Sequence, residues 1–157
     1  AASDVYKRQD DVSSVDAYNA SLTRSIAASL SEKKNEHQGA TVNGYAIFAG
    51  GESSAGLKTV DVFDASLTRK TATPLSVGMS NFASASIEDF AVFAGGFKAN
   101  GAVNAYSKSL TRTTLTLHSG HANRYALSGA RVGGYALFSG GLIDGTELDS
   151  VEAFTAL

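Results

Sequence analysis

The sequence predicts an all-β chain that folds as an incomplete β-propeller arc of about three four-stranded antiparallel blades. Three recurring segments predict it, each returning after about 45 residues in the same order. An apolar run ending in Gly-Gly occupies 44–51, 89–96 and 134–141. Ser-Leu-Thr-Arg occupies 21–24, 66–69 and 109–112, and a Val-Asp-Ala-Tyr type segment occupies 15–18, 60–63, 103–106 and 151–154. Repeats of this length with several strand-like segments are typical of propeller blades.

The first two strands of each repeat differ in side-chain size. Small residues dominate the first strand, at 38–42, 83–87 and 128–132, which favours a position near the axis, where blades crowd together. A tight turn follows, Asn43-Gly44 in the first copy, which is a strong hairpin signal. The second strand, 45–49 in that copy, is apolar at every position. We therefore expect it in the blade interior, covered on both faces.

The third strand is the Val-Asp-Val-Phe segment and its copies, and the fourth begins at Arg24, Arg69 or Arg112. The fourth strand is rich in Thr, Ser and Ala, which suits the outer edge of a blade. We expect each of these arginines to bridge neighbouring segments or cap the turn. No segment has a helical period.

The glycine pair after each second strand, and the aromatic residue that opens the strand, are predicted to be structural. Glycine allows positive φ and leaves room where no side chain fits. A phosphate-binding role is disfavoured because no helix follows. The residues concerned are Gly50, Gly51, Gly95, Gly96, Gly140 and Gly141, with Tyr45, Phe90 and Tyr135.

The repeats divide the chain into a series of units. Residues 4–9 read DVYKRQ and resemble the translated end of a sequencing-library adapter. We therefore interpret residues 1–10 as a disordered processing scar outside the repeat. The remaining units are a partial blade at 11–36 (strands three and four), blades at 37–75 and 82–117, and a partial blade at 125–157 (strands one to three).

Composition excludes several classes of partner. The chain has 13 basic and 15 acidic residues and no basic block, which argues against nucleic acid as the main partner. No apolar stretch approaches the roughly 20 residues of a spanning helix, so we expect no membrane insertion. Cysteine is absent, which excludes disulfides and thiolate metal sites. We expect neither a metal nor another cofactor.

A second strand that ends in Gly-Gly, a variable loop and a third strand that ends in an aromatic residue resemble the kelch repeat. The resemblance extends from about residue 12 to 157. The chain has no tryptophan, and Ser-Leu-Thr-Arg stands where the kelch tryptophan would follow the third strand. This pattern is similar to a degenerate kelch-like subtype of bacterial and phage repeat proteins. The resemblance implies a propeller, which closes with about 4–8 blades.

Three blades are too few for a closed ring, so we expect an open arc that the remaining blades of the same chain would complete. Uncovered apolar side chains, with Ile47, Phe48 and Val62 as examples, would each forfeit roughly 1.5–3 kcal/mol of burial. We expect the isolated arc to be marginally stable or prone to aggregate.

Alternating strand direction sorts the loops onto two faces. The turns between strands one and two, and between three and four, are nearly uniform. The loops between two and three (52–59, 97–102, 142–150) and from four to the next repeat (31–36, 76–81, 118–124) vary, which is typical of recognition loops on a rigid frame. The candidate binding residues on this variable face are Lys33, Lys34, Glu52, Lys58, Phe97, Lys98, Asn100, His118, His121, Arg124, Asp144 and Glu147.

Some of these residues have a second interpretation. His118 and His121 have a metal-ligand spacing, but no third ligand is anchored nearby, so surface histidines are favoured. Asp144, Glu147 and Asp149 offer oxygen ligands for calcium without a recognised spacing, so solvated charges are favoured. Lys33, Lys34 and Arg124 suit an acidic ligand or are ordinary surface charges.

Two functions remain open. The first is a binding scaffold that displays variable loops to a protein or glycan, at a cell surface, outside the cell or on a phage particle. The second is an enzyme similar to galactose oxidase or to sialic-acid-isomerising propellers, with catalytic residues partly in missing blades. The absence of cysteine counts against the copper oxidase, whose cofactor needs a Cys–Tyr link. No convergent acid–base set is present.

Overall fold

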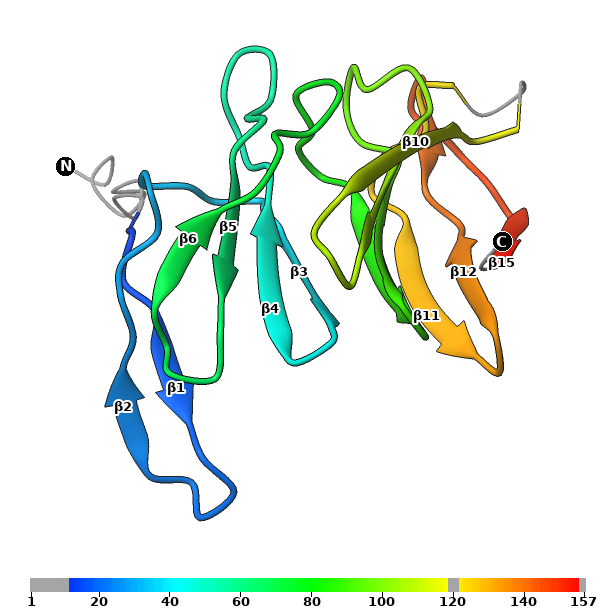
Figure 1. Cartoon of the computed structure of the whole chain (residues 1–157). Coiled ribbons are helices and arrows are strands. Elements are labelled where there is room, and N and C mark those ends of the chain that lie inside the picture. The colour runs from blue at the N-terminus through cyan, green and yellow to red at the C-terminus, as the bar shows by residue number, and fades with distance from the viewer. Residues whose placement is uncertain (1–11, 119–121, 156–157) are drawn as a thin grey trace, which may run out of the picture.

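The structure, a computed structural model, describes residues 12–118 and 122–155. The proposed scar at 1–10 and the candidate residue His121 lie outside these ranges. Within them the chain is all-β, as predicted, and contains strands β1 to β15 but no helix. The strands form separate antiparallel sheets that stand side by side (Figure 1). The row of sheets is open, with β1 and β2 at one end and β12 and β15 at the other.

The two central sheets each have four strands in sequence order. The first is β3–β4–β5–β6 and the second is β7–β8–β9–β10. Their bounds are Gln38–Val42, Tyr45–Ala49, Val60–Phe63 and Arg69–Thr71 for the first, and Ala83–Ile87, Phe90–Ala94, Ala102–Ser107 and Arg112–Thr116 for the second.

The outer sheets are smaller. At the start of the chain β1 pairs with β2, and at its end β12 lies between β11 and β15. Their bounds are Asp16–Tyr18, Arg24–Ile26, Ser128–Val132, Tyr135–Ser139 and Val151–Thr155. The fourth strands β2, β6 and β10 begin at Arg24, Arg69 and Arg112, as the repeat predicts.

One hairpin was not expected from the sequence. The segment 142–150, interpreted as a loop, contains β13 (Leu142–Ile143) paired with β14 (Thr146–Glu147). The turn between them is Asp144-Gly145, with φ of 50° and 79°. Two successive positive φ values are the requirement of a type I′ turn, for which Asp-Gly is a preferred sequence. The Asp144-Gly145 turn therefore explains the small hairpin within this loop.

The first strands of neighbouring sheets lie close together. Ser84 Oγ donates to the carbonyl oxygen of Gly39 at 2.7 Å, and the Thr41 amide donates to Ser86 Oγ at 2.8 Å. A Cβ placed on Gly129 would lie 2.2 Å from the backbone oxygen of Ser84. The small side chains of β3, β7 and β11 therefore permit a separation that larger ones would forbid.

Apolar layers fill the spaces between the sheets. One layer joins β3–β6 to β7–β10, a second joins β7–β10 to the last sheet, and a smaller one joins β1–β2 to β3–β6. The expectation that Ile47, Phe48 and Val62 would be uncovered is wrong. Ile47 and Val62 are fully buried, and Phe48 packs edge-on against Phe63 with ring centroids 5.8 Å apart. These residues are covered because their sheet lies between two others.

The glycine pairs lie where one sheet meets the segment that leads to the next. All six glycines have positive φ. A Cβ on Gly50 would lie 2.6 Å from the Met79 carbonyl oxygen, and one on Gly95 would lie 2.8 Å from that of Arg124. In the first two pairs the second glycine also donates its amide there, Gly51 to Met79 and Gly96 to Arg124. The backbone conformation favours glycine at all six positions, and the close approach also requires it at each of them except Gly140, where a Cβ would meet nothing nearer than 3.7 Å.

The close approach of β11 to β7 makes a testable prediction. We expect Gly129→Ala to lower the free energy of unfolding by about 1–3 kcal/mol, because the new methyl group overlaps the Ser84 backbone and forces the sheets apart. Urea denaturation followed by circular dichroism measures the change. Gly134→Ala is the matched control, because its Cβ would meet nothing nearer than 3.5 Å. Equal effects of the two substitutions would contradict the packing described here.

Candidate functional site

The connections between strands separate onto two sides of the molecule (Figure 1). The tight turns lie at the bottom of that view, and the longer connections lie at the top. The two kinds of longer connection meet through the same backbone hydrogen bond in every repeat. Glu52 donates to Asn35 at 3.0 Å, Phe97 to Ser80 at 2.9 Å and Leu142 to Tyr125 at 2.8 Å. The variable loops therefore form one continuous face on a repeated frame.

A depression of about 360 Å³ lies on this face. Loop residues from the first central sheet form one wall, and loop residues from the second form the other. The segments that lead into the second central sheet and the last sheet contribute as well. The lining residues are Glu36, Glu52, Ser53, Ser54, Ala55, Gly56, Ser80, Asn81, Phe97, Lys98 and Tyr125. A concave site of this size is in the usual range for a small ligand.

An aromatic corner lies at the edge of the depression. The Phe97 ring meets the Tyr125 ring edge-on, with centroids 5.6 Å apart and planes at 86°. Although apolar, Phe97 is 49% exposed. Lys98 Nζ lies 5.3 Å from the centroid of the Phe97 ring. On the opposite wall Glu52 Oε2 accepts a hydrogen bond from Asn35 Nδ2 at 2.8 Å. The depression thus combines an open aromatic face with placed polar groups.

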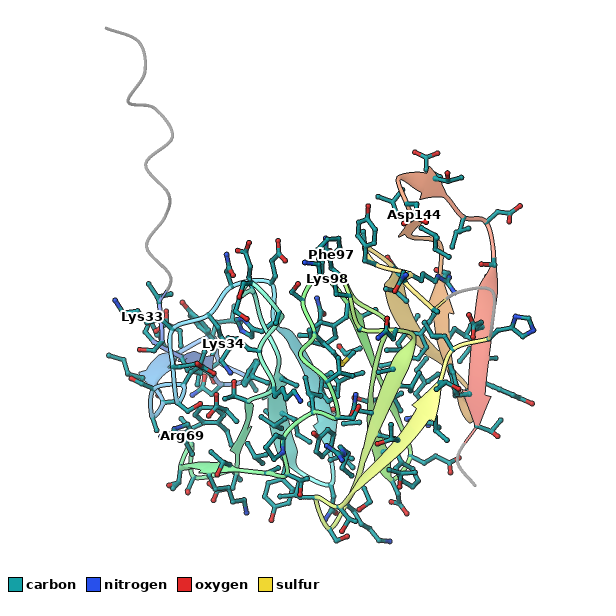
Figure 2. The ribbon with its side chains drawn as sticks, turned by 90° about the horizontal axis from the view of Figure 1, so that it is seen from above. Lys33, Lys34, Arg69, Phe97, Lys98 and Asp144 are labelled. Atoms are coloured by element: carbon teal, nitrogen blue, oxygen red, sulfur yellow. The ribbon has the colours of Figure 1, made fainter. Side chains whose placement is uncertain are left out.

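The structure brings only some of the predicted binding residues together. Glu52, Phe97 and Lys98 line the depression. The other exposed candidates among the described residues do not: Lys33, Lys58, Asn100, His118, Asp144 and Glu147. In Figure 2 the labelled Lys33, Phe97 and Asp144 follow one another across the molecule and do not converge. Asp144 and Glu147, which were interpreted as solvated charges in preference to calcium ligands, belong to the small β13–β14 hairpin.

Lys34 and Arg124 are not surface contacts, so the prediction that placed them at the rim of the variable face is wrong. Both side chains are buried and their charges are neutralised inside the protein. Lys34 Nζ lies 3.0 Å from Asp61 Oδ2, and Arg124 Nη1 lies 3.1 Å from Glu152 Oε1. An isolated charge at these depths would be very costly, which is why each has an acidic partner.

The Lys34–Asp61 contact ties the segment before a sheet to the third strand of that sheet. Asp61 also accepts hydrogen bonds from the Ser31 amide at 3.1 Å and from Ser31 Oγ at 3.0 Å. Arg69 Nη1 donates to the other side of the carboxylate at 3.0 Å. Lys34 Nζ donates in addition to Thr59 Oγ1 at 3.0 Å. Both carboxylate oxygens of Asp61 and the Lys34 ammonium therefore have hydrogen-bond partners.

The same arrangement recurs in the next two repeats with different chemistry. The Ser76 amide donates to Asn104 Oδ1 at 2.9 Å, and Asn104 Nδ2 lies 3.3 Å from Met79 Sδ. In the last sheet the His118 amide donates to Glu152 Oε2 at 2.8 Å. We call each set a linker anchor. Its members are Ser31, Lys34 and Asp61 in the first, Ser76, Met79 and Asn104 in the second, and His118, Arg124 and Glu152 in the third.

Arg124 makes the most contacts of the anchor residues. Besides Glu152, its guanidinium donates to three carbonyl oxygens, those of Gly140 at 2.6 Å, Ser150 at 2.8 Å and Phe138 at 3.2 Å. The planar, five-donor guanidinium suits such a set better than an ammonium group. Arg124 therefore fixes the end of the second strand of the last sheet to the start of its third strand.

Sequence reasoning missed the linker anchors, although the sequence holds a signal for them. Residues 34, 79 and 124 are spaced by 45, and their third-strand partners follow 25 to 28 residues later. Where the first position is a cation the second is an acid, and where the first is Met the second is Asn. Comparing these two positions across the repeats would have indicated a buried contact. Considered one at a time, Lys34 and Arg124 look like surface charges.

The repeated arginines join the fourth strands to other segments of the chain. Arg24 pairs with Asp16 at 2.8 Å and Arg69 with Asp61 at 3.0 Å, in each case joining the fourth strand to the third. In the repeat that contains Arg112, the third strand has Asn104 in place of an acid. Arg112 donates instead to the carbonyl oxygen of Pro74. That oxygen belongs to the segment between the two central sheets. The expected bridging of neighbouring segments is therefore present, with a different partner in the neutral repeat.

The histidines show no assembled metal site. The backbone amide of His118 belongs to the third linker anchor, and His121 lies outside the described ranges. Within residues 12–118 and 122–155 no three His, Asp or Glu side chains come together as ligands. In the same ranges there is no helix with the length and apolar character needed to cross a membrane.

Burial alone would raise the pKa of Asp61, but its hydrogen bonds and ion pairs have the larger combined effect. Lys34, Ser31 and Arg69 donate to the carboxylate, and the Lys34 charge adds to the effect, so the pKa lies below its ordinary value of 3.8. A carboxyl group with a lowered pKa in the folded state stabilises the fold at neutral pH. That stabilisation is lost as the pH falls through the pKa that the carboxyl group has in the folded protein.

The second linker anchor contains no charged residue, which suggests a rescue experiment on the first. We expect Lys34→Met to lower the free energy of unfolding by about 3 kcal/mol, because it removes the buried ammonium that faces Asp61. Lys34→Met combined with Asp61→Asn recreates the Met79–Asn104 pair and should recover most of the loss. Urea denaturation of the two variants measures both effects. A double variant no more stable than Lys34→Met would contradict the equivalence of the anchors.

The same double variant tests the acid dependence of stability. Wild-type stability should fall as the pH drops below about 4, because Asp61 of the unfolded chain takes up a proton there while the folded carboxylate, with its lowered pKa, does so only at lower pH. In the Lys34→Met/Asp61→Asn variant this contribution is absent, so the decline between pH 4 and pH 2 should be shallower. Thermal unfolding at a series of pH values gives the two slopes. Parallel curves would show that Asp61 does not contribute.

Comparison with known proteins supports the fold. No protein-family model and no curated protein matches the sequence, whereas 135 chains of solved structures match. One of these is the structure of YjhT, which matches with a TM-score of 0.70 and 14% sequence identity. The match covers 91% of this chain and 48% of that chain, so the present chain spans about half the length of this neighbour. At this identity the likeness is one of fold.

Proposed function

We propose that the chain is an arc of a kelch-like β-propeller that acts as a carbohydrate-binding module through its variable-loop face. The observation that carries the proposal is the aromatic corner of Phe97 and Tyr125 at the depression. An aromatic ring left about half exposed beside hydrogen-bonding groups is a feature of ligand sites. Further repeats of the same chain are the proposed completion of the ring.

A sugar matches both parts of the depression. The C–H face of a pyranose ring is apolar and packs on an aromatic ring such as Phe97. Its hydroxyl groups need donors and acceptors, which Ser53, Ser54 and Asn81 can supply. Two carboxylates, Glu36 and Glu52, and one ammonium group, Lys98, line the site. This balance disfavours anionic glycans, so a neutral saccharide is the proposed ligand.

The frame beneath the depression supports a binding role. Asn81 and Ser80 follow Met79 of the second linker anchor, and Phe97 follows the glycine pair that contacts Arg124 of the third. The lining residues are therefore attached to buried contacts at both walls. Loops held in place before the ligand arrives lose less conformational entropy on binding. The loops can consequently differ in sequence while their bases stay fixed.

A glycan array tests the proposed function. We expect the wild-type chain to bind at least one class of neutral saccharide, and Phe97→Ala to weaken that binding about tenfold or more, as for a central aromatic contact. Leu115→Ala is the control, because Leu115 is an exposed apolar residue on β10 away from the depression. Titration by isothermal calorimetry with the best array hit gives the ratio. Absence of any glycan ligand, or equal binding by Phe97→Ala, would exclude a carbohydrate site here.

A further inference from the structure

The depression is built from equivalent positions of neighbouring repeats. Six of its lining residues form three pairs spaced by 45: Glu52 with Phe97, Glu36 with Asn81, and Ser80 with Tyr125. Glu52 and Phe97 each directly follow a glycine pair, and the amide of each donates to a carbonyl oxygen in the segment that precedes its own sheet. The same backbone frame therefore presents a carboxylate in one repeat and an aromatic ring in the next.

Asn35 holds the Glu52 carboxylate in place. The Glu52 amide donates to the Asn35 carbonyl oxygen at 3.0 Å, and Asn35 Nδ2 donates to Glu52 Oε2 at 2.8 Å. Lys34, the residue before Asn35, is buried against Asp61. Gly51, the residue before Glu52, approaches the segment so closely that a Cβ would lie 2.9 Å from the Asn35 oxygen. Both backbones are therefore fixed, and the Glu52 side chain loses little further freedom when a ligand binds.

The Glu52 carboxylate has one oxygen bound to the protein and one available to a ligand. Oε2 accepts the Asn35 hydrogen bond, and Oε1 accepts none from the described residues. An ionised carboxylate has no proton to donate. A ligand group that meets Oε1 must therefore be a donor, and the resulting charge-assisted hydrogen bond is roughly twice as strong as one between neutral groups.

We propose that Glu52 is the specificity-determining residue of the depression and that Asn35 is its positioning residue. This inference rests on the proposed function and names the feature that a saccharide needs there. That feature is a free hydroxyl group that donates a hydrogen bond to Glu52 while the C–H face of the sugar packs on Phe97. Analogues in which the hydroxyl is removed, methylated or replaced by fluorine leave the carboxylate without a donor, and a site built for a hydroxyl rejects such analogues.

Fluorinated sugars test the proposal, because a C–F group has nearly the size of a hydroxyl group but donates no hydrogen bond. The probes are the methyl pyranosides of glucose, galactose and mannose and the monodeoxyfluoro derivatives of each. Each probe is titrated into the wild-type chain and binding is followed by NMR. For the pyranoside that binds, we expect fluorine at one position to raise the dissociation constant about tenfold or more.

Glu52→Gln should abolish this discrimination. Asn35 Nδ2 needs an acceptor, so the glutamine carbonyl oxygen turns to it and the glutamine NH₂ group is left for the ligand. A donor at this point pairs with a hydroxyl oxygen or with fluorine, so the two forms of the sugar should bind with similar dissociation constants.

Adding Asn35→Asp should restore the discrimination. The new carboxylate accepts from the glutamine NH₂ group, so the glutamine oxygen is left for the ligand and the site again requires a donor. A merely structural role of the pair predicts no such reversal, because the second substitution would add to the damage of the first.

Glu88→Gln is the matched control, because Glu88 is an exposed carboxylate in the tight turn between β7 and β8, away from the depression. It should discriminate like the wild type. Circular dichroism and thermal unfolding confirm that each variant is folded. Unchanged discrimination in Glu52→Gln, or no recovery in the double variant, would overturn the roles of Glu52 and Asn35 and leave the carbohydrate site standing. A wild-type chain that binds none of the pyranosides would also overturn the inference, and the glycan array would still decide the proposed function by itself.

Discussion

The arrangement of the sheets depends on one polar side chain, buried or partly buried, in the third strands β5, β9 and β15. Asp61, Asn104 and Glu152 each accept the amide of the incoming segment and meet a side chain from a few residues further on. Without these contacts the segment between two sheets would be a surface loop with unpaired backbone groups. With these contacts, the segment that leads into each sheet is bound to the third strand of that sheet. The glycine pairs of the preceding sheet can then pack against this segment.

The linker anchors hold the bases of the loops that form the variable face. Ser80 and Asn81, which line the depression, follow Met79 of the uncharged Met79–Asn104 pair. The walls of the depression carry the exposed aromatic ring and most of the polar groups that could orient a ligand. Divergent loop sequence and a constant loop base are compatible here, because the hydrogen bonds that hold the base come largely from the backbone.

Much of the fold could be predicted from the sequence, because strands and turns are encoded by local patterns that recur. The apolar second strands, the Asn43-Gly44 turn and the fourth-strand arginines are all readable within a few residues. The candidate site could be predicted only in part. Glu52, Phe97 and Lys98 were found because divergent loops indicate exposure, whereas Lys34 and Arg124 were misplaced. Their burial depends on acids 27 and 28 residues away, and no local pattern reports a partner at that distance.

The anchors also limit how such a chain can evolve by exchanging its parts. A crossover between two repeats that falls between positions 34 and 61 would unite a lysine with an asparagine, or a methionine with an aspartate. The first product would bury an ammonium with nothing to neutralise it, and the second would leave Asp61 with Arg69 as its one remaining cation. Genetic recombination within this repeat is therefore tolerated only where both members of a pair are inherited together. The smallest unit that can be exchanged with its buried contacts intact therefore begins ahead of the linker and not at the first strand of a sheet.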